Sequence, residues 1–291
     1  FTGIDYSDQR IDEDIINDEG SQLYLKYIIP KEINVAKYFL AALIQESLII
    51  RTSFFTDITF IDAVRANIQR MYTFKSQGTE FNELIQSYLA NMNLSSTSFE
   101  TGDFIKKWLR KFEIGDDISF ELTDDGLGVH IYLLKGDERI LLADEGYGIT
   151  QLLSILLHIE LKTKNKTYKY SHPLVNGEQV KYYESTISLE EPETNLHPKF
   201  QSLLAEMFVD AYKTYNIRFI VETHSEYLIR KLQTLVAKKE LKPDDVALHY
   251  LYHHDEAKRP AGKPQVLNIK IKEDGRLSEP FGTGFFDEAD N

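Results

Sequence analysis

The chain has 291 residues, and 42% of them are hydrophobic. It contains no cysteine and carries a formal net charge of −13. Without cysteine it forms neither a disulfide nor a Cys-ligated metal site, and no apolar run in the sequence reaches the ~18 residues of a membrane-spanning helix. We therefore predict a cytoplasmic protein with no membrane segment. The acidic balance disfavours a surface that coats nucleic acid throughout, although a local basic patch remains open.

The first part of the chain predicts helices and a β-hairpin. Apolar residues at helical spacing predict three helices, over residues 35–50, 81–92 and 103–112. Residues 118–123 and 129–134 alternate apolar and polar side chains on either side of the turn Asp124-Asp-Gly-Leu-Gly128, which is typical of an antiparallel hairpin. We expect these elements to form a lobe beside a parallel sheet.

A glycine-rich turn, Asp144-Glu-Gly-Tyr-Gly148, opens a strongly apolar helix. Gly146 and Gly148 permit close approach of another molecule to the backbone, and Thr150 and Gln151 lie at the start of the helix. The free N–H groups of a helix N-terminus attract anions. The turn is therefore either a phosphate-binding segment or a simple helix cap, and its own sequence does not separate the two.

Residues 161–184 predict a hairpin between the apolar helix and the next strand. The stretch from Leu161 to Tyr170 interleaves four lysines with threonine and two tyrosines, and Asn176-Gly177 is a strong type I′ turn signal. Basic and aromatic side chains together track phosphates and stack on bases. The hairpin is either a surface for nucleic acid or a partner protein or, as the simpler alternative, a pair of solvated strands.

The most informative segment is Thr186-Ile-Ser-Leu-Glu-Glu-Pro-Glu-Thr-Asn-Leu-His-Pro198, in which an apolar strand ends in Glu190 and Glu191. Ligands of open α/β sheets bind at the carboxyl ends of the strands. There, one carboxylate can hold a hydrated Mg²⁺ ion while its neighbour orients an attacking water. The alternative is a strand followed by an acidic surface turn.

A second strand is predicted to end beside these acids. Residues 199–215 predict an amphipathic helix, and Asn216-Ile-Arg-Phe-Ile-Val-Glu-Thr-His224 predicts a strand that a further helix follows at once. A strand–helix–strand unit with a right-handed crossover makes a parallel pair. His224 is therefore expected beside Glu190 and Glu191, which favours a functional histidine over a structural one.

Near the C-terminus, residues 246–254 and 265–272 predict another strand pair. The run His253-His254-Asp255-Glu256 lies at a strand end, where neighbouring side chains point apart. We interpret it as a solvated turn rather than a metal site.

In this order, the motifs resemble the nucleotide-binding domain of ABC-type ATPases, in particular the soluble RecF-like, SMC-like and overcoming-lysogenization-defect ATPases. The resemblance covers about residues 58 to 288 and is most specific in the run Glu190-Glu-Pro-Glu-Thr-Asn-Leu-His-Pro198. The segments that resemble named family motifs are a signature motif (144–151), a Walker B strand (186–191), a D-loop (195–198) and a switch histidine (His224). The segment from Phe60 to Arg65 is similar to one that these ATPases carry ahead of the signature.

The resemblance implies an α/β fold of the P-loop NTPase type, with a parallel sheet and an inserted helical and β-hairpin lobe. On this basis we expect the lobe and insertion region in residues 1–112, the ATPase core in residues 113–240 and a β-rich appendage in residues 241–291.

The resemblance also implies a role for each site residue. Glu190 would bind Mg²⁺, Glu191 would polarise the attacking water, and His224 would contact the γ-phosphate of ATP. The glycine-rich turn would bind the γ-phosphate of ATP held by a second subunit, through Gly146, Gly148, Thr150 and Gln151. A homodimer closed through its ATP sites would then act as a nucleotide-driven switch.

One motif that the resemblance requires is missing from the sequence. A phosphate-binding loop needs Gly-x-x-x-x-Gly-Lys-[Ser/Thr], whereas no two glycines here have that spacing, and the single Gly-Lys pair, Gly262-Lys263, runs into Pro264. Because the chain starts at Phe1 rather than Met, we expect the loop upstream, in a longer ATPase. The alternative is a degenerate ATPase that never had one.

ATPases of this branch often serve anti-phage defence together with a separate nuclease. We expect that role, with a nuclease or another effector as partner and with nucleic acid left open as a ligand. The alternatives are DNA repair, a nuclease fused to the ATPase, and a non-catalytic scaffold. A fused nuclease domain needs an Asp-x-Asp pair after a strand, which the C-terminal region lacks.

Overall fold

The computed structural model describes residues 58–65, 67–74, 79–91, 101–164, 185–253, 255, 257, 259–282 and 285. The chain divides into two compact units, residues 1–57 and 58–291, and the described residues all belong to the second. The helix predicted over residues 35–50 therefore lies outside the described residues. The domain boundaries expected after residues 112 and 240 remain predictions.

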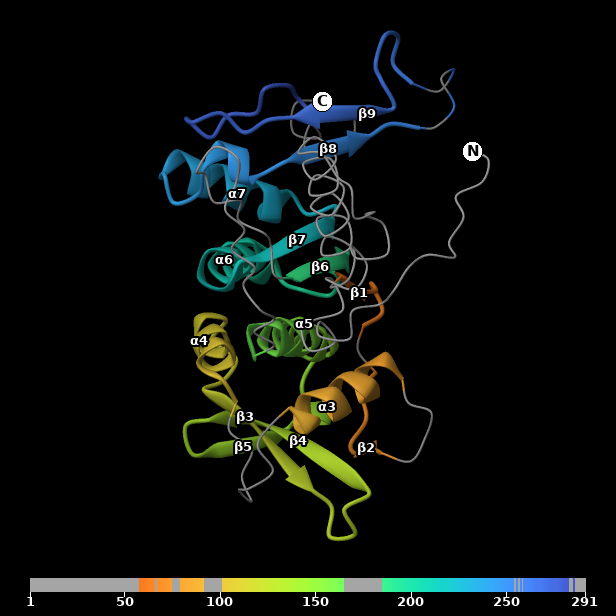
Figure 1. Ribbon diagram of the computed structural model, residues 1–291, viewed down its shortest axis with the longest axis vertical. Helices are drawn as coiled ribbons and strands as arrows, with labels where there is room; N and C mark the ends of the chain where they lie inside the picture. Colours follow the sequence, from red (N-terminus) through yellow and green to blue (C-terminus); the bar gives the residue numbers. More distant parts are fainter. Residues whose placement is uncertain are drawn as a thin grey trace, which may run out of the picture. The chain divides into compact units, whose positions relative to one another are not determined.

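A parallel sheet of three strands forms the centre of this unit (Figure 1). Strand β6 (Ser185–Glu190) lies between β1 (Ile58–Ile61) and β7 (Ile217–Glu222). Helix α6 (Pro198–Tyr215) connects β6 to β7. The strand–helix–strand unit predicted from the sequence is therefore confirmed.

The residues at the two ends of α6 explain where this helix begins and ends. The His197 side chain accepts a hydrogen bond from the backbone N–H of Lys199, and Pro198 occupies the first turn, where a missing N–H costs nothing. Asn216 stops the helix in the left-handed conformation at φ +59°, one of the few residue types that adopt it readily. The chain then enters β7 directly.

The two faces of the parallel sheet differ in burial. On the face that α6 covers, Ile187 is fully buried and Phe219 contacts Phe208 of α6 at 4.8 Å between ring centroids. On the other face, Phe60 and Ile220 occupy the same row across the sheet and are 72% and 53% exposed. Parallel sheets are normally covered on both faces, so the open face is a candidate contact for further polypeptide.

Helix α5 (Tyr147–Lys164) is apolar around most of its circumference, and a helix with that pattern is buried. Its buried apolar residues are Leu152, Leu153, Ile155, Leu156, Leu157 and Ile159. Helices α3 (Glu80–Ala90) and α4 (Asp103–Lys111) pack against it and confirm two of the predicted helices, with small shifts at their ends.

The strand predicted to start at Leu161 is wrong over residues 161–164, because α5 continues through Lys164. The apolar run before Leu161 is buried as a helix, and its regular hydrogen bonding carries on past the last buried turn. The rest of the predicted hairpin, residues 165–184, lies outside the described residues.

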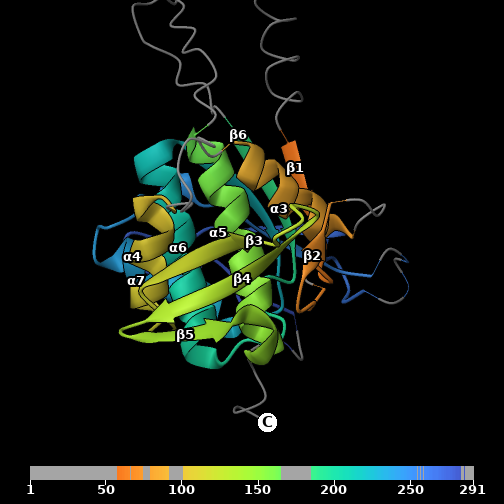
Figure 2. The same cartoon turned by 90° about the horizontal axis from the view of Figure 1, so that it is seen from below.

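A second, antiparallel sheet lies on the side of α3, α4 and α5 that faces away from the parallel sheet (Figure 2). Its longest strand, β4 (Gly128–Lys135), pairs with β3 (Asp117–Leu122), which confirms the predicted hairpin. It also pairs with the short strands β2 (Tyr72–Thr73) and β5 (Glu138–Leu141). Helices α3, α4 and α5 thus form a layer between the two sheets, and one hydrophobic core runs through all three layers.

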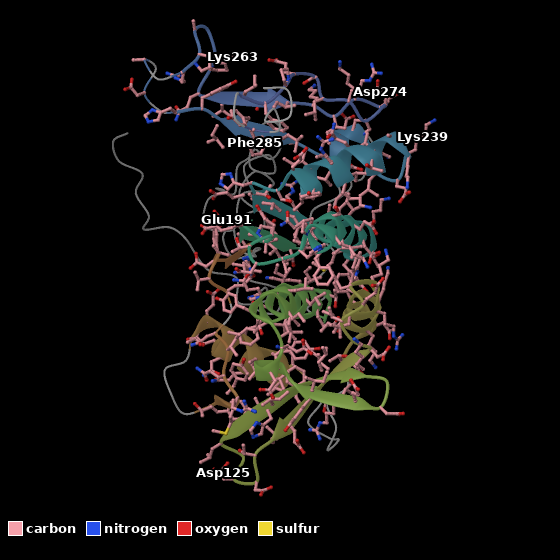
Figure 3. All side chains as sticks on the ribbon, turned by 180° about the vertical axis from the view of Figure 1, so that it is seen from behind. Asp125, Glu191, Lys239, Lys263, Asp274 and Phe285 are labelled. Atoms are coloured by element: carbon pink, nitrogen blue, oxygen red, sulfur yellow. The ribbon has the colours of Figure 1, made fainter. Side chains whose placement is uncertain are left out.

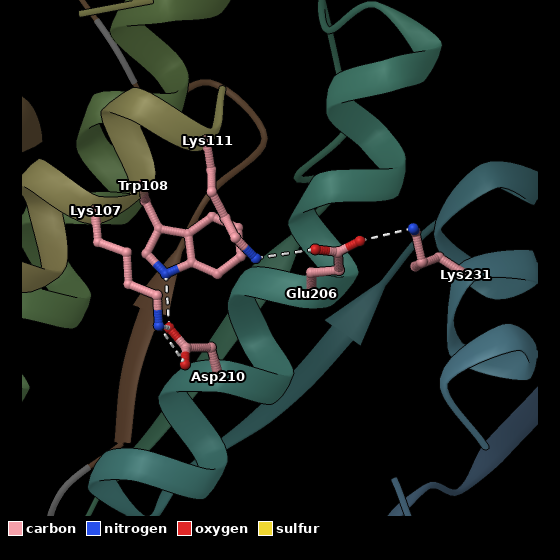
Figure 4. A network of polar contacts seen from close by, with 6 residues as sticks. All are labelled: Lys107, Trp108, Lys111, Glu206, Asp210 and Lys231. Carbon is pink, nitrogen blue, oxygen red and sulfur yellow. Dashed lines mark hydrogen bonds and ion pairs between the residues drawn. The ribbon is translucent and has the colours of Figure 1, made fainter. Parts of the chain in front are cut away.

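Two acidic residues of α6, Asp210 and Glu206, form polar contacts with the neighbouring helices (Figure 4). Asp210 accepts a hydrogen bond of 2.9 Å from Nε1 of the fully buried Trp108 and pairs with Lys107, both on α4. Glu206 pairs with Lys111 of α4 and with Lys231 of α7 (Glu226–Ala237). Burial alone would raise the pKa of the Glu206 carboxyl, but the hydrogen bonds from the two lysines outweigh it and lower that pKa.

We expect Trp108→Phe to lower the free energy of unfolding by about 2 kcal/mol, because it removes a buried hydrogen bond to a charged acceptor. Lys107→Met removes the more exposed partner of the same carboxylate and should cost less than about 1 kcal/mol. Urea denaturation followed by circular dichroism measures both. A larger loss for the lysine variant would show that the ion pair, rather than the indole N–H, holds α4 to α6.

The C-terminal segment packs on α7. Strands β8 (Leu248–Leu251) and β9 (Val266–Ile269) form the predicted antiparallel pair, after a 3-10 turn at Pro243–Asp245. Beyond β9, Gly275 adopts φ +81° and accepts a hydrogen bond of 2.8 Å from Gln233 of α7. A Cβ atom there would lie 2.7 Å from the Gln233 carbonyl oxygen, so only glycine fits. Among the described residues, no helix is long and apolar enough to cross a membrane.

Candidate active site

Carboxylates collect where the three parallel strands end. Glu190 and Glu222 are the last residues of β6 and β7 and are paired in the register, and Asp62 follows the last residue of β1. Because the strands run in the same direction, all three acids reach one edge of the sheet. Figure 3 shows Glu191, the next residue after β6, at this edge.

Asp62 and Glu190 form a close carboxylate pair. The negative charge of Asp62 and a hydrogen bond between the two side chains raise the pKa of Glu190 above its ordinary value. Both line a small cavity of about 140 Å³, together with Phe60, Ser188 and Glu80. The pKa of Glu80 is also raised, first by burial and then by the charge of Asp62.

The pair fits a hydrated Mg²⁺ ion. This cation prefers oxygen ligands and is usually held by one or two carboxylates together with water and substrate phosphate. A cation would also relieve the repulsion between Asp62 and Glu190. Within the described part of the chain, there is no group of three or more His, Cys, Asp or Glu side chains suited to a metal ion.

Glu191 has a strained backbone that is held on several sides. Its φ is +41°, in the left-handed region that costs a non-glycine residue roughly 1–2 kcal/mol. Its N–H donates to the carbonyl of Glu222 at 2.9 Å, and its carboxylate accepts from the Thr194 hydroxyl at 3.1 Å. Such strain persists where the surrounding structure enforces it, and it is concentrated at functional sites.

A buried arginine, Arg65, binds the backbone of Asp62, Glu190 and Glu191. Arg65 is 2% exposed and donates to the backbone carbonyls of Asp62 (2.9 Å), Glu190 (2.9 Å) and Glu191 (2.6 Å). Sequence reasoning noted the segment from Phe60 to Arg65 but assigned Asp62 and Arg65 no role. The available signal was a strand ending in an acid, with an arginine three residues later.

His224 lies two residues beyond the end of β7. It is exposed, and its backbone N–H donates to the Glu193 carboxylate at 2.6 Å. Ser225 then caps α7 by accepting from the N–H of Leu228 at 3.1 Å, and its hydroxyl donates to Gln201 of α6 at 2.6 Å. The structure thus brings His224 to the acidic turn after β6 through Glu193.

The glycine-rich turn follows a 3-10 turn, Leu142–Asp144, and packs against the turn after β6. A Cβ atom on Gly148 would overlap the carbonyl oxygen of Asn195, whereas a Cβ atom on Gly146 would meet nothing within 4 Å. Gly148 is therefore needed for a contact within this chain, and Gly146 is the glycine with open space beside it.

Thr150 and Gln151 are buried, at 0% and 1% exposure. Gln151 donates to the carbonyl of Ala63 at 3.2 Å, in the loop that carries Arg65. The Thr150 hydroxyl has no hydrogen-bond partner among the described residues. Both side chains face the protein interior, so the exposed part of the predicted signature segment is the turn that contains Gly146.

The parallel sheet has carboxylates at the carboxyl ends of adjacent strands, and helix α6 joins β6 to β7, which is consistent with an α/β protein of the P-loop NTPase type. The chain belongs to the family described as "AAA ATPase domain", which matches residues 11–229. Residues 241–291 match a second family, described as "Protein of unknown function (DUF3696)". The family match supports the ATPase resemblance found in the sequence.

A comparison with curated proteins found no match. Among solved structures, one similar chain comes from work titled "Structural biochemistry of ATP-driven dimerization and DNA stimulated activation of SMC ATPases". It is 10% identical, and the alignment covers 67% of this chain and 91% of that chain with a TM-score of 0.39.

Proposed function

We propose that this chain hydrolyses ATP as part of an ABC-type ATPase, with its chemistry at the carboxyl ends of β1, β6 and β7. The observation that carries the proposal is the geometry of the turn after β6. Glu190 is paired with Asp62 at the sheet edge, and Glu191 is held beside it in a strained conformation. One of these acids can hold the magnesium ion and the other can orient the attacking water, two roles that recur in nucleoside-triphosphate hydrolysis.

In this proposal Asp62 and Glu190 hold Mg²⁺, and the ion, when bound, neutralises charge on the phosphate oxygens. Glu191 accepts a hydrogen bond from the attacking water and orients it. The Thr194 hydroxyl, which donates to the Glu191 carboxylate, limits the rotation of that side chain. His224, at the end of the neighbouring strand, contacts the γ-phosphate.

We also propose that polypeptide outside this sequence supplies the phosphate-binding loop. The sequence lacks the glycine spacing that such a loop requires. Residues 1–291 alone should then show no ATP turnover, because nothing cradles the phosphates. Magnesium-dependent turnover should appear once the chain is joined to, or mixed with, the loop-bearing polypeptide. A steady-state phosphate-release assay decides, and robust turnover by residues 1–291 alone would contradict this part.

Nucleotide-driven dimerisation completes the proposal. The turn around Gly146 is exposed, next to a helix N-terminus, and has open space beside it. In a homodimer it would face the γ-phosphate of ATP held by the other copy, so that ATP closes the dimer and hydrolysis opens it.

On the family resemblance, we assign the switch to anti-phage defence with a separate nuclease as effector. Loss of protection in a plaque assay on Glu191→Gln would support that role.

A further inference from the structure

Arg65 is a buried charge that needs explaining. Arg65 lies four residues beyond the end of β1 and is 2% exposed, and its side chain donates to backbone carbonyls of the described residues. A buried cation is costly unless hydrogen bonds satisfy it. Here the partners are three backbone carbonyls and no carboxylate, so the guanidinium is placed to bind backbone.

Two of the carbonyls that Arg65 binds belong to Glu190, the predicted Mg²⁺ ligand, and Glu191, the predicted catalytic acid. Two of its nitrogens donate to consecutive residues, Nη1 to Glu190 and Nη2 to Glu191, so the planar guanidinium spans the peptide unit that joins them. Nη1 also binds the carbonyl of Asp62, the other member of the carboxylate pair. One side chain therefore fixes the backbone of all three acids.

The loop that carries Arg65 is itself held in place. Gln151 of α5 donates to the carbonyl of Ala63 at 3.2 Å, between Asp62 and Arg65. On the other side, the Glu191 N–H is bound to Glu222 of β7. The left-handed conformation of Glu191 is thus maintained from β1 and from β7 at once.

We propose that Arg65 is a positioning residue for ATP hydrolysis. It sets the peptide between Glu190 and Glu191 so that the Glu191 carboxylate meets the attacking water. This inference rests on the proposed function, because it assumes that Glu191 orients the water. Arg65 has no role in binding ATP in this arrangement, since Nη1 and Nη2 donate to backbone carbonyls and the remaining donor, Nε, is buried without a hydrogen-bond partner among the described residues.

The test uses Arg65→Lys and Arg65→Met in the ATPase that includes its phosphate-binding loop, with Arg110→Lys as control. Lysine keeps the charge but cannot span two carbonyls, and methionine fills similar volume without a buried charge. Both Arg65 variants should lower kcat about 10- to 100-fold with little change in the KM for ATP. Arg110 lies on α4, is exposed and pairs with Asp116, the residue before β3. The Arg110→Lys variant should therefore keep the wild-type kcat.

Two further measurements separate positioning from general stability. Hydrogen exchange should become faster at the Glu191 and Thr194 amides in the Arg65 variants, while the amides of α5 stay protected. Arg65→Lys combined with Glu191→Gln should be no slower than Glu191→Gln alone, because both changes act through one carboxylate.

Three outcomes would overturn the inference. The first is a folded Arg65 variant with wild-type kcat, the second is a multiplicative loss in the double variant, and the third is failure of both Arg65 variants to fold, which would make Arg65 a structural residue. If Glu191→Gln itself turns over ATP normally, the proposed function fails instead, whatever Arg65 does.

Discussion

Glu191→Gln is expected to lower ATP turnover by about 100-fold or more while ATP binding persists, the range seen when a positioned base is removed. Glutamine has the shape of glutamate and can still accept from the Thr194 hydroxyl, which lies 3.1 Å from the carboxylate. The left-handed backbone of Glu191 is held by Arg65 and Glu222, so the turn should keep its conformation. Phosphate release and nucleotide binding measured on the same preparation separate the chemical step from affinity.

Glu190→Gln is the matched comparison, one residue away on the same turn. It removes half of the carboxylate pair with Asp62, so it should raise the Mg²⁺ concentration needed for half-maximal activity and weaken nucleotide binding. The two variants are therefore expected to differ: Glu191→Gln loses turnover and keeps ATP binding, whereas Glu190→Gln loses affinity for Mg²⁺ and nucleotide. Wild-type turnover by Glu191→Gln, or the same defect in both variants, would show that the two roles have been assigned wrongly.

Gly148→Ala is expected to lower the free energy of unfolding by about 1–3 kcal/mol, the usual range for forcing extra volume into a packed site. The added carbon meets the backbone carbonyl of Asn195, which a rotamer change cannot move aside. The turn after β6 must then shift, so ATP turnover should fall together with stability. Gly146→Ala adds the same carbon two residues earlier in open space and should leave both quantities close to wild type.

The same comparison gives a test of the dimer. Gly146→Asp places a carboxylate on the exposed turn without a clash inside the chain, so it should block ATP-driven dimerisation and leave the melting temperature unchanged. Light scattering with ATP and with ADP measures the assembly. Gly148→Asp is a poorer probe, because its effect on the fold cannot be separated from its effect on phosphate. If ATP closes the Gly146→Asp protein as well as wild type, the turn is a helix cap and not a phosphate site.

Local patterns in the sequence were sufficient to predict most of the described elements. The alternation around the turn 124–128 predicted the β3–β4 hairpin, and the apolar spacing of residues 199–215 predicted α6. Both patterns involve neighbours in sequence, where period and turn chemistry decide the outcome. The strand expected from Leu161 was wrong over residues 161–164, since burial of α5 by surrounding layers extends that helix beyond its apolar run.

The sequence by itself determined which residues could carry the chemistry. An apolar strand that ends in Glu190 and Glu191 has to place them at a sheet edge, because two charges inside the sheet would be too costly. Only the tertiary structure decided what surrounds them. Asp62 and Arg65 lie more than 120 residues earlier in the chain, and their roles depend on β1 pairing with β6, a contact that no local pattern encodes. Likewise, the need for glycine at position 148 comes from the carbonyl of Asn195, which reaches it only because two distant turns pack together.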